Sequence, residues 1–323
     1  MDAPHAPTFF EGPEKKLELA VTDGVSLRAQ GDEFWNRVVA ASGAHVLSVL
    51  RGESCDAYLL SESSLFVFDG YLTMITCGQT RLVDAAHLLV AQLGAERVAL
   101  CTYERKNEHF PTRQPTSFYD DARRLGALLP GTALRFGDVH DHHVHLFHTT
   151  RPYAPVQNDT TVEILMHGLP DDAASRFIGC ERPARGSLAE ARGVTRILPG
   201  FAIDEHPFTP AGYSMNGLRG EDYYTVHVTP ESLGSYVSFE NTHDVRREGA
   251  LAQQVERVLG VIRPRSIDVV RFAPASSASR PTLAPTGYAL KDRVHTVAAG
   301  YDVDFWHCFR PGEGLRPAAT LRL

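Results

Sequence analysis

The stretch 57-AYLLSESSLFVFDGYLTMITC-77 contains the strongest fold signal in the chain. An Asp-Gly pair at positions 69 and 70 separates two apolar runs, at residues 57–68 and 71–77. Asp-Gly between such runs favours a β-hairpin, because glycine readily adopts the positive φ that a tight hairpin turn requires. The stretch therefore predicts two antiparallel strands joined by a two-residue turn.

The same turn fixes which residues of the hairpin face each other. With the Asp-Gly pair as the turn, Glu62 is opposite Cys77 and Ser63 is opposite Thr76. Neighbours across a strand pair lie about 5 Å apart, which brings the Cys77 thiol next to the Glu62-Ser63 bond. A bulge would shift this pairing by one residue and reverse the faces.

The rest of the chain alternates strand-like and helix-like patterns. Strands outnumber helices, which favours antiparallel sheets with helices on their outer faces. No fixed-period repeat and no low-complexity linker occurs, so we expect residues 1–323 to form a single domain. The expected strands are at residues 16–21, 45–50, 97–103 and several between 213 and 240, and the expected helices are at residues 32–43, 80–94, 122–129 and 246–262.

The composition argues against several classes of protein. A net charge of −7 and a pI near 6.1 argue against nucleic-acid binding, which requires clustered basic residues. No apolar run approaches the length of a membrane span, and the N-terminus lacks a signal-peptide pattern. The five cysteines are widely spaced and fit reduced thiols, so the expected location is the cytosol. They are Cys55, Cys77, Cys101, Cys180 and Cys308.

Six short blocks, taken in order, resemble the eukaryotic type of S-adenosylmethionine decarboxylase, a self-cleaving pyruvoyl enzyme of polyamine synthesis. The resemblance runs from about Phe9 to the final strands. It implies an α+β fold, a four-layer αββα sandwich of two antiparallel sheets flanked by helices. The blocks are Phe9-Phe10-Glu11-Gly12-Pro13-Glu14-Lys15, Glu62-Ser63-Ser64, Thr76-Cys77-Gly78, Gly212-Tyr213-Ser214-Met215-Asn216-Gly217, His227-Val228-Thr229-Pro230-Glu231 and Ser235-Tyr236-Val237-Ser238-Phe239-Glu240.

The resemblance implies that the chain cuts itself between Glu62 and Ser63. A serine hydroxyl can attack the preceding carbonyl and exchange the amide for an ester; removal of the serine α-proton then eliminates the upstream carboxylate. Hydrolysis of the resulting dehydroalanine leaves a pyruvoyl group and ammonia. The expected products are a β chain, residues 1–62, and an α chain, residues 63–323, with pyruvate derived from Ser63 as its covalent cofactor.

The resemblance also assigns the catalytic side chains. His227 is at the position of the proton-abstracting base, Ser214 at that of its supporting hydroxyl, and Cys77 at that of the proton donor to the substrate. Glu11, together with Glu14 of the same block, is placed among the active-site carboxylates. The alternatives are a strand histidine bonded to the backbone for His227 and a small buried hydrophobe for Cys77.

The implied substrate is S-adenosylmethionine, whose adenine and sulfonium favour aromatic surroundings. Phe10 and Phe208 match the pair that flanks adenine in the family. Glu231 matches the acceptor for the two ribose hydroxyls, and Leu60 matches a residue that contributes backbone contacts. Each phenylalanine could instead be ordinary core packing.

A second group of residues matches the acidic site that holds the activator putrescine in animal members. Because buried carboxylates need a compensating cation, a diamine or a built-in basic residue is expected there. Ile75 and Glu104 depart from the family pattern. Lys16 is where plant members, which need no putrescine, carry arginine, and Arg105 is retained. We therefore expect Lys16 and Arg105 to neutralise the cluster, whose acidic and polar members are Glu18, Asp159, Thr161, Glu163 and Glu240. The alternative is that the extra carboxylate of Glu104 restores a need for a diamine.

The histidine-rich tract at residues 140–148 resembles a metal site at first sight. His143 and His145 would share one strand face, and imidazole binds zinc or copper. No nearby carboxylate or cysteine completes a recognised ligand spacing, so an exposed turn and edge strand is the favoured interpretation, with no metal expected.

Three other functions compete with an active decarboxylase. The first is a catalytically inactive paralogue that activates a decarboxylase partner subunit; the intact Glu62-Ser63 and His227 argue against it. The second is a metal-binding module, and the third is a pyruvoyl decarboxylase with another amino-acid substrate. The resemblance leaves a monomer and a homodimer both open.

Overall fold

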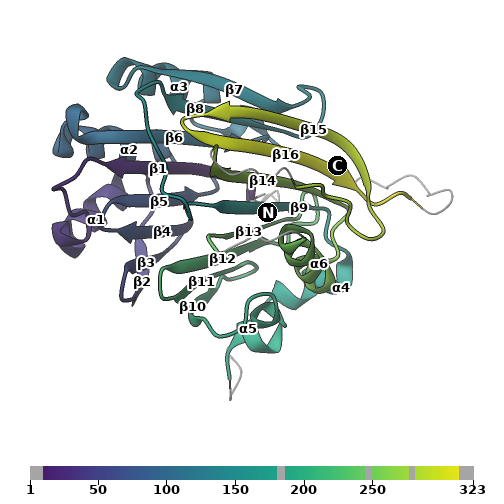
Figure 1. Ribbon diagram of the computed structural model, residues 1–323. Coiled ribbons are helices and arrows are strands. Elements are labelled where there is room, and N and C mark those ends of the chain that lie inside the picture. The colour runs from purple at the N-terminus through teal and green to yellow at the C-terminus, as the bar shows by residue number, and fades with distance from the viewer. Residues whose placement is uncertain (1–9, 180–185, 244–248, 276–280, 313–323) are drawn as a thin grey trace, which may run out of the picture.

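The computed structural model describes residues 10–179, 186–243, 249–275 and 281–312. These residues form two eight-stranded antiparallel sheets (Figure 1). In the first sheet the strands lie in the order β2-β3-β4-β5-β1-β6-β8-β7. Their bounds are β1 Lys15–Val21, β2 Val46–Arg51, β3 Cys55–Leu60, β4 Ser63–Phe68, β5 Tyr71–Thr76, β6 Val98–Lys106, β7 Gly131–Gly137 and β8 His143–Thr149.

The second sheet repeats the strand order of the first. Its order is β10-β11-β12-β13-β9-β14-β16-β15, so each strand takes the place of the strand eight positions earlier. The sequence shows no fixed-period repeat, and the duplication is visible only in the topology. The bounds are β9 Thr161–His167, β10 Ala202–Pro207, β11 Tyr213–Arg219, β12 Asp222–Thr229, β13 Tyr236–Asn241, β14 Ser266–Pro274, β15 Ala289–Ala298 and β16 Tyr301–Phe309.

Helices pack on the outer face of each sheet. One apolar cluster joins the first sheet to α1, α2 and α3, and another joins the second sheet to α4, α5 and α6 (Figure 1). None of these helices is long and apolar enough to cross a membrane, within the ranges described. The helices are α1 Gly31–Ala41, α2 Leu82–Leu93, α3 Phe118–Leu128, α4 Asp171–Ala174, α5 Leu188–Ala191 and α6 Ala250–Ile262, with 3-10 turns η1 Arg28–Gln30, η2 Ala95–Arg97, η3 Pro111–Arg113, η4 Ser175–Phe177 and η5 Val194–Arg196.

The sandwich of two helix-covered antiparallel sheets is confirmed. All six residues of β4 are buried, and the four from Leu65 to Phe68 are apolar. Leu65 and Val67 belong to the cluster on the helix side, whereas Phe66 and Phe68 belong to the cluster that faces Leu218 of the second sheet. Successive side chains of a strand point to opposite faces, so a strand covered on both sides has no polar face to present to water.

The predicted register of the hairpin is confirmed, but its first strand is shorter than expected. Ser63 pairs with Thr76, as the Asp-Gly turn predicted. Residues 57–68 do not form one continuous strand, because Ser61 and Glu62 make a second tight turn between β3 and β4. The expected cleavage bond therefore lies at a hairpin corner rather than within a strand.

Candidate active site

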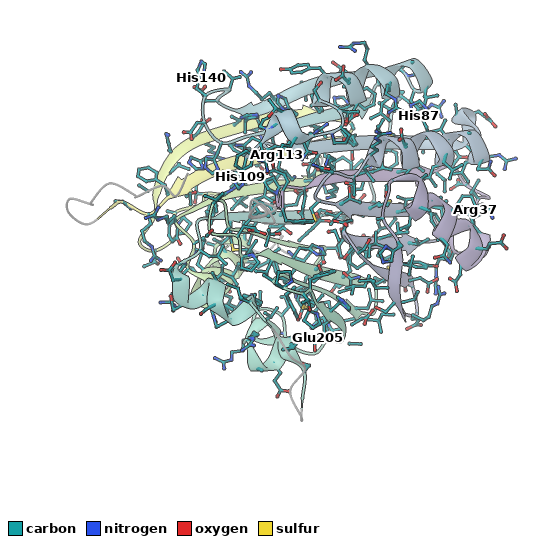
Figure 2. The ribbon with its side chains drawn as sticks, turned by 180° about the vertical axis from the view of Figure 1, so that it is seen from behind. Arg37, His87, His109, Arg113, His140 and Glu205 are labelled. Carbon is teal, nitrogen blue, oxygen red and sulfur yellow. The ribbon has the colours of Figure 1, made fainter. Side chains whose placement is uncertain are left out.

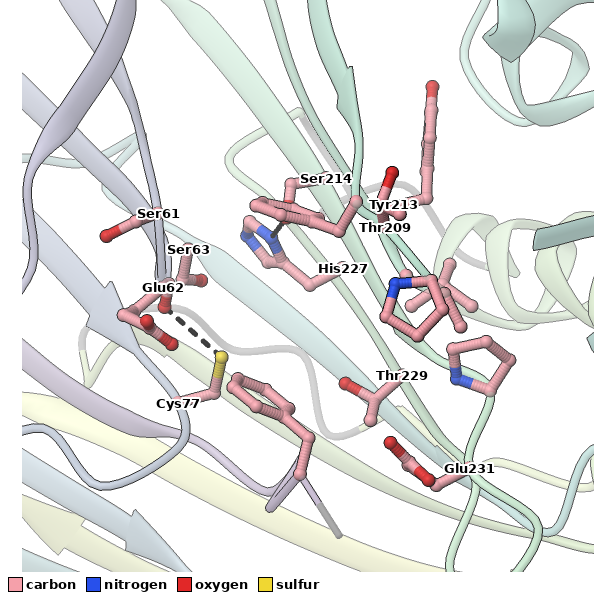
Figure 3. Close-up of a pocket in the computed structure, with 17 residues that line it drawn as sticks. Ser61, Glu62, Ser63, Cys77, Thr209, Tyr213, Ser214, His227, Thr229 and Glu231 are labelled. Atoms are coloured by element: carbon pink, nitrogen blue, oxygen red, sulfur yellow. Dashed lines mark hydrogen bonds between the residues drawn. The ribbon is translucent and has the colours of Figure 1, made fainter. Parts of the chain in front are cut away.

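A cavity of about 350 Å³ lies where the corner of the first sheet faces strands β11 and β12 of the second (Figure 3). Both sheets contribute to its lining. Eight residues that the sequence singled out line it, namely Phe10, Glu62, Ser63, Cys77, Phe208, Ser214, His227 and Glu231. Leu60 is fully buried and pairs with Ser63 across the turn, while Glu11 and Glu14 lie outside the lining.

The backbone at the expected cleavage bond is strained. Ser63 has φ of 135°, a value that residues with a side chain rarely adopt. Such a conformation costs on the order of 1–3 kcal/mol and persists only where the surroundings enforce it. Here the two-residue turn on one side and the pairing with Thr76 on the other hold Ser63 in place.

The carbonyl of Glu62 accepts two hydrogen bonds from one residue. The backbone N–H of Cys77 donates to it at 2.9 Å, and the Cys77 Sγ lies 3.2 Å from the same oxygen (Figure 3). Donors placed this way stabilise negative charge that develops on a carbonyl oxygen under attack. The register of β4 and β5 thus produces an oxyanion site at the Glu62-Ser63 bond.

The hydroxyl of Ser63 is buried, and its oxygen has no hydrogen-bond partner among the described residues. A buried hydroxyl without a partner is uncommon, because leaving it unpaired costs free energy. No hydrogen bond to another described residue therefore holds this hydroxyl away from the Glu62 carbonyl.

His227 is held between two hydroxyl groups in the second sheet. Its Nδ1 lies 2.9 Å from Ser214 Oγ (Figure 3). Its Nε2 lies 2.7 Å from Thr225 Oγ1. Thr225 donates its proton to the carbonyl oxygen of Met215 at 2.9 Å, so it accepts from the imidazole. This network assigns the proton of His227 to Nε2 and the lone pair to Nδ1, which accepts from Ser214. Burial lowers the pKa of His227 to about 3. The imidazole is therefore neutral at pH 7, the form that can accept a proton.

Three residues of this site were not singled out from the sequence. The Oγ of Ser64 donates to Asn216 Oδ1 at 2.6 Å and lies 3.3 Å from His227 Nε2. Asn216 in turn donates to the backbone carbonyl of Tyr58 at 3.2 Å, which ties β11 to β3. The spacing of Thr225 and His227, two residues apart on one strand face, is a signal that could have identified Thr225.

The Cys77 thiol is fully protonated at neutral pH, since burial raises its pKa well above the ordinary value, with a smaller contribution from nearby Glu62. Gly78 follows it with φ of 63°, and a side chain there would approach the Phe10 ring to 3.1 Å. Glycine at this position therefore allows the Phe10 ring to lie beside the Cys77 loop. A buried thiol that keeps its proton, as Cys77 does, suits a proton donor better than a thiolate nucleophile.

The two predicted carboxylates outside the lining have different environments. Glu11 accepts the backbone N–H groups of His109 and Phe110, each at 2.8 Å, and so anchors that segment beside the cavity. Glu14 is buried and accepts from Ser238 Oγ at 2.7 Å. Burial raises the pKa of Glu14 to about 8, so its carboxyl group keeps a proton at pH 7.

The acidic residues predicted to form a charged core come together between the sheets. Lys16 Nζ lies 3.0 Å from Glu163, 3.2 Å from Glu240 and 3.9 Å from Glu18. Asp159 accepts from the Tyr301 hydroxyl at 2.5 Å. Thr161 is buried at the start of β9, two positions before Glu163.

The prediction that Arg105 helps to neutralise the cluster is wrong. Arg105 does not reach these carboxylates, because its guanidinium binds Glu108 and Asp121, the latter at 2.8 Å. The second cation is instead Lys106, which points to the opposite face of β6 and pairs with Glu163 and, at 2.9 Å, with Glu104. Period-two alternation along the strand places these two neighbours on opposite faces.

Carboxyl groups outnumber lysines in this cluster, so some of them keep their protons. Burial raises the pKa of Glu104 and of Glu240 to about 7 in each case, despite the nearby lysines. Glu163 contacts both lysines, and these two cations lower its pKa to about 2 against the effect of burial. At pH 7 the cluster therefore has an ionised centre, Glu163, and partly protonated acids around it.

The pKa of His227 predicts a measurable pH dependence of stability. The unfolded chain binds a proton at this histidine below about pH 6.5, whereas the folded chain does not until about pH 3. Stability contributed by neutral His227 is complete above pH 6.5 and is lost as the pH falls. Between pH 7 and pH 5 the loss is about 2 kcal/mol.

Urea unfolding of Ser63→Ala and of Ser63→Ala/His227→Asn at both pH values measures this loss, since neither variant can process. The single variant should lose about 2 kcal/mol more than the double variant on acidification. Glu14 and the charged cluster are present in both variants, so their contributions to the pH dependence of stability cancel in the comparison. Equal losses in the two proteins would contradict the buried neutral imidazole.

Comparisons with known proteins identify the family. The family model for adenosylmethionine decarboxylase matches residues 7–307. The S-adenosylmethionine decarboxylase proenzyme of Dictyostelium discoideum is 33% identical across 91% of this chain and 84% of its own; that of Xenopus laevis is 31% identical across 85% and 86%. A Trypanosoma brucei AdoMetDC-delta26 monomer structure shares the fold, with a TM-score of 0.59, 21% identity and coverage of 77% of this chain and 99% of that one. The chain belongs to the adenosylmethionine decarboxylase family.

Proposed function

We propose that this chain cleaves itself between Glu62 and Ser63 and then decarboxylates S-adenosylmethionine, supplying the aminopropyl donor for spermidine and spermine synthesis. One observation carries the proposal. The unpaired Ser63 hydroxyl, at a strained φ, follows a carbonyl that accepts two hydrogen bonds from Cys77. The same cavity contains His227 and the aromatic residues expected for the substrate.

Self-cleavage uses the strained turn and its hydrogen bonds. Ser63 Oγ attacks the Glu62 carbonyl carbon, and the two donors of Cys77 stabilise the charge that forms on the oxygen. His227, neutral and oriented by Ser214 and Thr225, removes the Ser63 α-proton. Elimination releases the carboxylate of Glu62, so residues 1–62 become the β chain and stay in the fold. Water then converts the resulting dehydroalanine at position 63 to the pyruvoyl group of the α chain, with release of ammonia.

Decarboxylation uses the same cavity. The pyruvoyl group supplies the electron sink for the electrons left when CO₂ departs. Phe10 and Phe208 bind the faces of adenine, and Glu231 accepts from the ribose hydroxyls. The neutral Cys77 thiol delivers the proton to the substrate carbon after loss of CO₂.

The regulatory alternative has less support. An inactive paralogue needs neither a strained Ser63 nor a neutral, oriented His227, yet both are present. Since both sheets line the cavity, we propose that residues 1–323 act as a single domain. The four described cysteines are free thiols, which supports a reducing compartment such as the cytosol.

We further propose that Lys16 and Lys106 replace the diamine activator. Together they pair with four carboxylates of the charged cluster, Glu18, Glu104, Glu163 and Glu240. Glu104, one of the departures from the family pattern, pairs with Lys106, so the protein itself supplies the cation that this carboxylate needs. Activity is then constitutive.

Release of labelled CO₂ from carboxyl-labelled S-adenosylmethionine tests the activity. Wild-type protein should release it, and Cys77→Ala should be slower by about 10²-fold or more per cleaved chain, because it lacks the proton donor. Cys101→Ala removes a thiol that is also buried but lies in a core cluster, and should retain activity. No release by cleaved wild-type protein would overturn the proposed substrate.

The same assay, on protein stripped of polyamines, tests the activator proposal. Wild-type activity should not change when putrescine is added, because its charge is already present. Lys16→Met should lose several-fold in rate and regain part of it with putrescine, whereas Lys291→Met, at an exposed lysine, should behave as wild type. A several-fold stimulation of the wild type would show that the two lysines do not suffice.

A further inference from the structure

A buried aspartate outside the cavity binds three histidines. Asp268 Oδ2 lies 2.9 Å from His142 Nδ1 and 3.2 Å from His167 Nε2, and its Oδ1 lies 2.7 Å from His307 Nδ1. Asp268, His167 and His307 are buried, and His142 is largely buried. None of the four lines the cavity described above.

The four residues come from distant parts of the sequence. His167, Asp268 and His307 lie at neighbouring positions on β9, β14 and β16 of the second sheet. His142 belongs to the loop that joins β7 to β8 of the first sheet. The sequence led us to expect an exposed tract in which no carboxylate completes a recognised ligand spacing. The structure brings a carboxylate to His142 from β14, more than a hundred residues away.

The separations of these atoms match a metal coordination shell. Ligands held 2.0–2.2 Å from a tetrahedral zinc ion lie about 3.3 Å from one another. The ligand atoms of His142, His167 and Asp268 all lie within 4.8 Å of one another, and so do those of Asp141, His142 and His307. Two histidines with one carboxylate are a ligand set used for divalent transition metals.

We propose that His142, His167 and Asp268 bind a divalent transition-metal ion of the zinc class, with His307 orienting the carboxylate through its other oxygen. A hydrogen bond from a second histidine to a ligating carboxylate is the kind of outer contact that supports metal sites. A carboxylate oxygen of Asp141 lies within 4.8 Å of ligand atoms of His142 and His307, and Asp141 is already paired with Lys291. In the metal-free protein, protons on the imidazoles satisfy Asp268; metal binding displaces two of them.

The bound ion would join the two sheets. His142 is the only contribution of the first sheet to the three proposed ligands, so the ion fixes the β7–β8 loop to the second sheet. The His109 ring lies 6.2 Å from the His167 ring, and the backbone N–H of His109 donates a hydrogen bond to Glu11. The site therefore stabilises the sandwich beside the segment that borders the cavity.

Metal content and thermal stability test the site without any assay of catalysis. Untagged protein is treated with EDTA, dialysed and incubated with ZnCl₂, and metal retained after gel filtration is measured. Wild type should retain about one zinc per chain, and its Tm should rise by about 5 °C at saturating zinc. With CoCl₂ it should show the visible absorption of a low-coordinate cobalt site.

His142→Ala, which truncates a loop residue, should lose the retained zinc, the Tm shift and the cobalt spectrum, while its Tm in EDTA stays close to that of wild type. Asp268→Asn should lose zinc as well. His140→Ala, at an exposed histidine of the same tract (Figure 2), should retain all three properties. Zinc retention by wild type no greater than that of His142→Ala, or equal loss in His140→Ala, would overturn the proposal.

Discussion

The pairing of β4 with β5 is the constraint on which the site depends. It places the N–H and thiol of Cys77 on the carbonyl of Glu62, and it holds one side of the strained Ser63 in place. A shift of one residue would turn Ser64 away from Asn216 and His227 and remove both donors from the bond to be cut. The buried apolar side chains of β4, which face a helix layer on one side and a sheet on the other, make such a shift costly.

The second determinant is how the buried carboxyl groups between the sheets are paired with lysines or protonated. Lysines at adjacent strands contact Glu163 and keep it ionised, whereas the surrounding acids keep protons. Near the cavity, burial keeps His227 neutral and Cys77 protonated. Each group proposed to be catalytic is thus in the form its role requires at pH 7, and the largest cause in both cases is exclusion from water.

The sequence predicted local features well and distant contacts poorly. The Asp69-Gly70 turn determines the hairpin register, because a two-residue turn leaves no freedom in pairing. The corner at Ser61-Glu62 carries no glycine or proline, so nothing in the sequence marked it. Arg105 and Lys106 point to opposite faces of β6, and only the face of Lys106 meets the charged cluster. The sequence could not assign these faces, because the hydrophobic periodicity is ambiguous in a strand buried on both sides. Asp268 and His142 meet only because the two sheets pack against each other, which no local pattern encodes.

Intact mass under denaturing conditions, on freshly purified protein beside a Ser63→Ala control, tests the central claim most directly. The strained, unpaired serine and the doubly hydrogen-bonded carbonyl predict two chains, residues 1–62 and a pyruvoyl-capped chain from position 63, with the control uncut. A single chain of 35.5 kDa in the wild type would contradict the account.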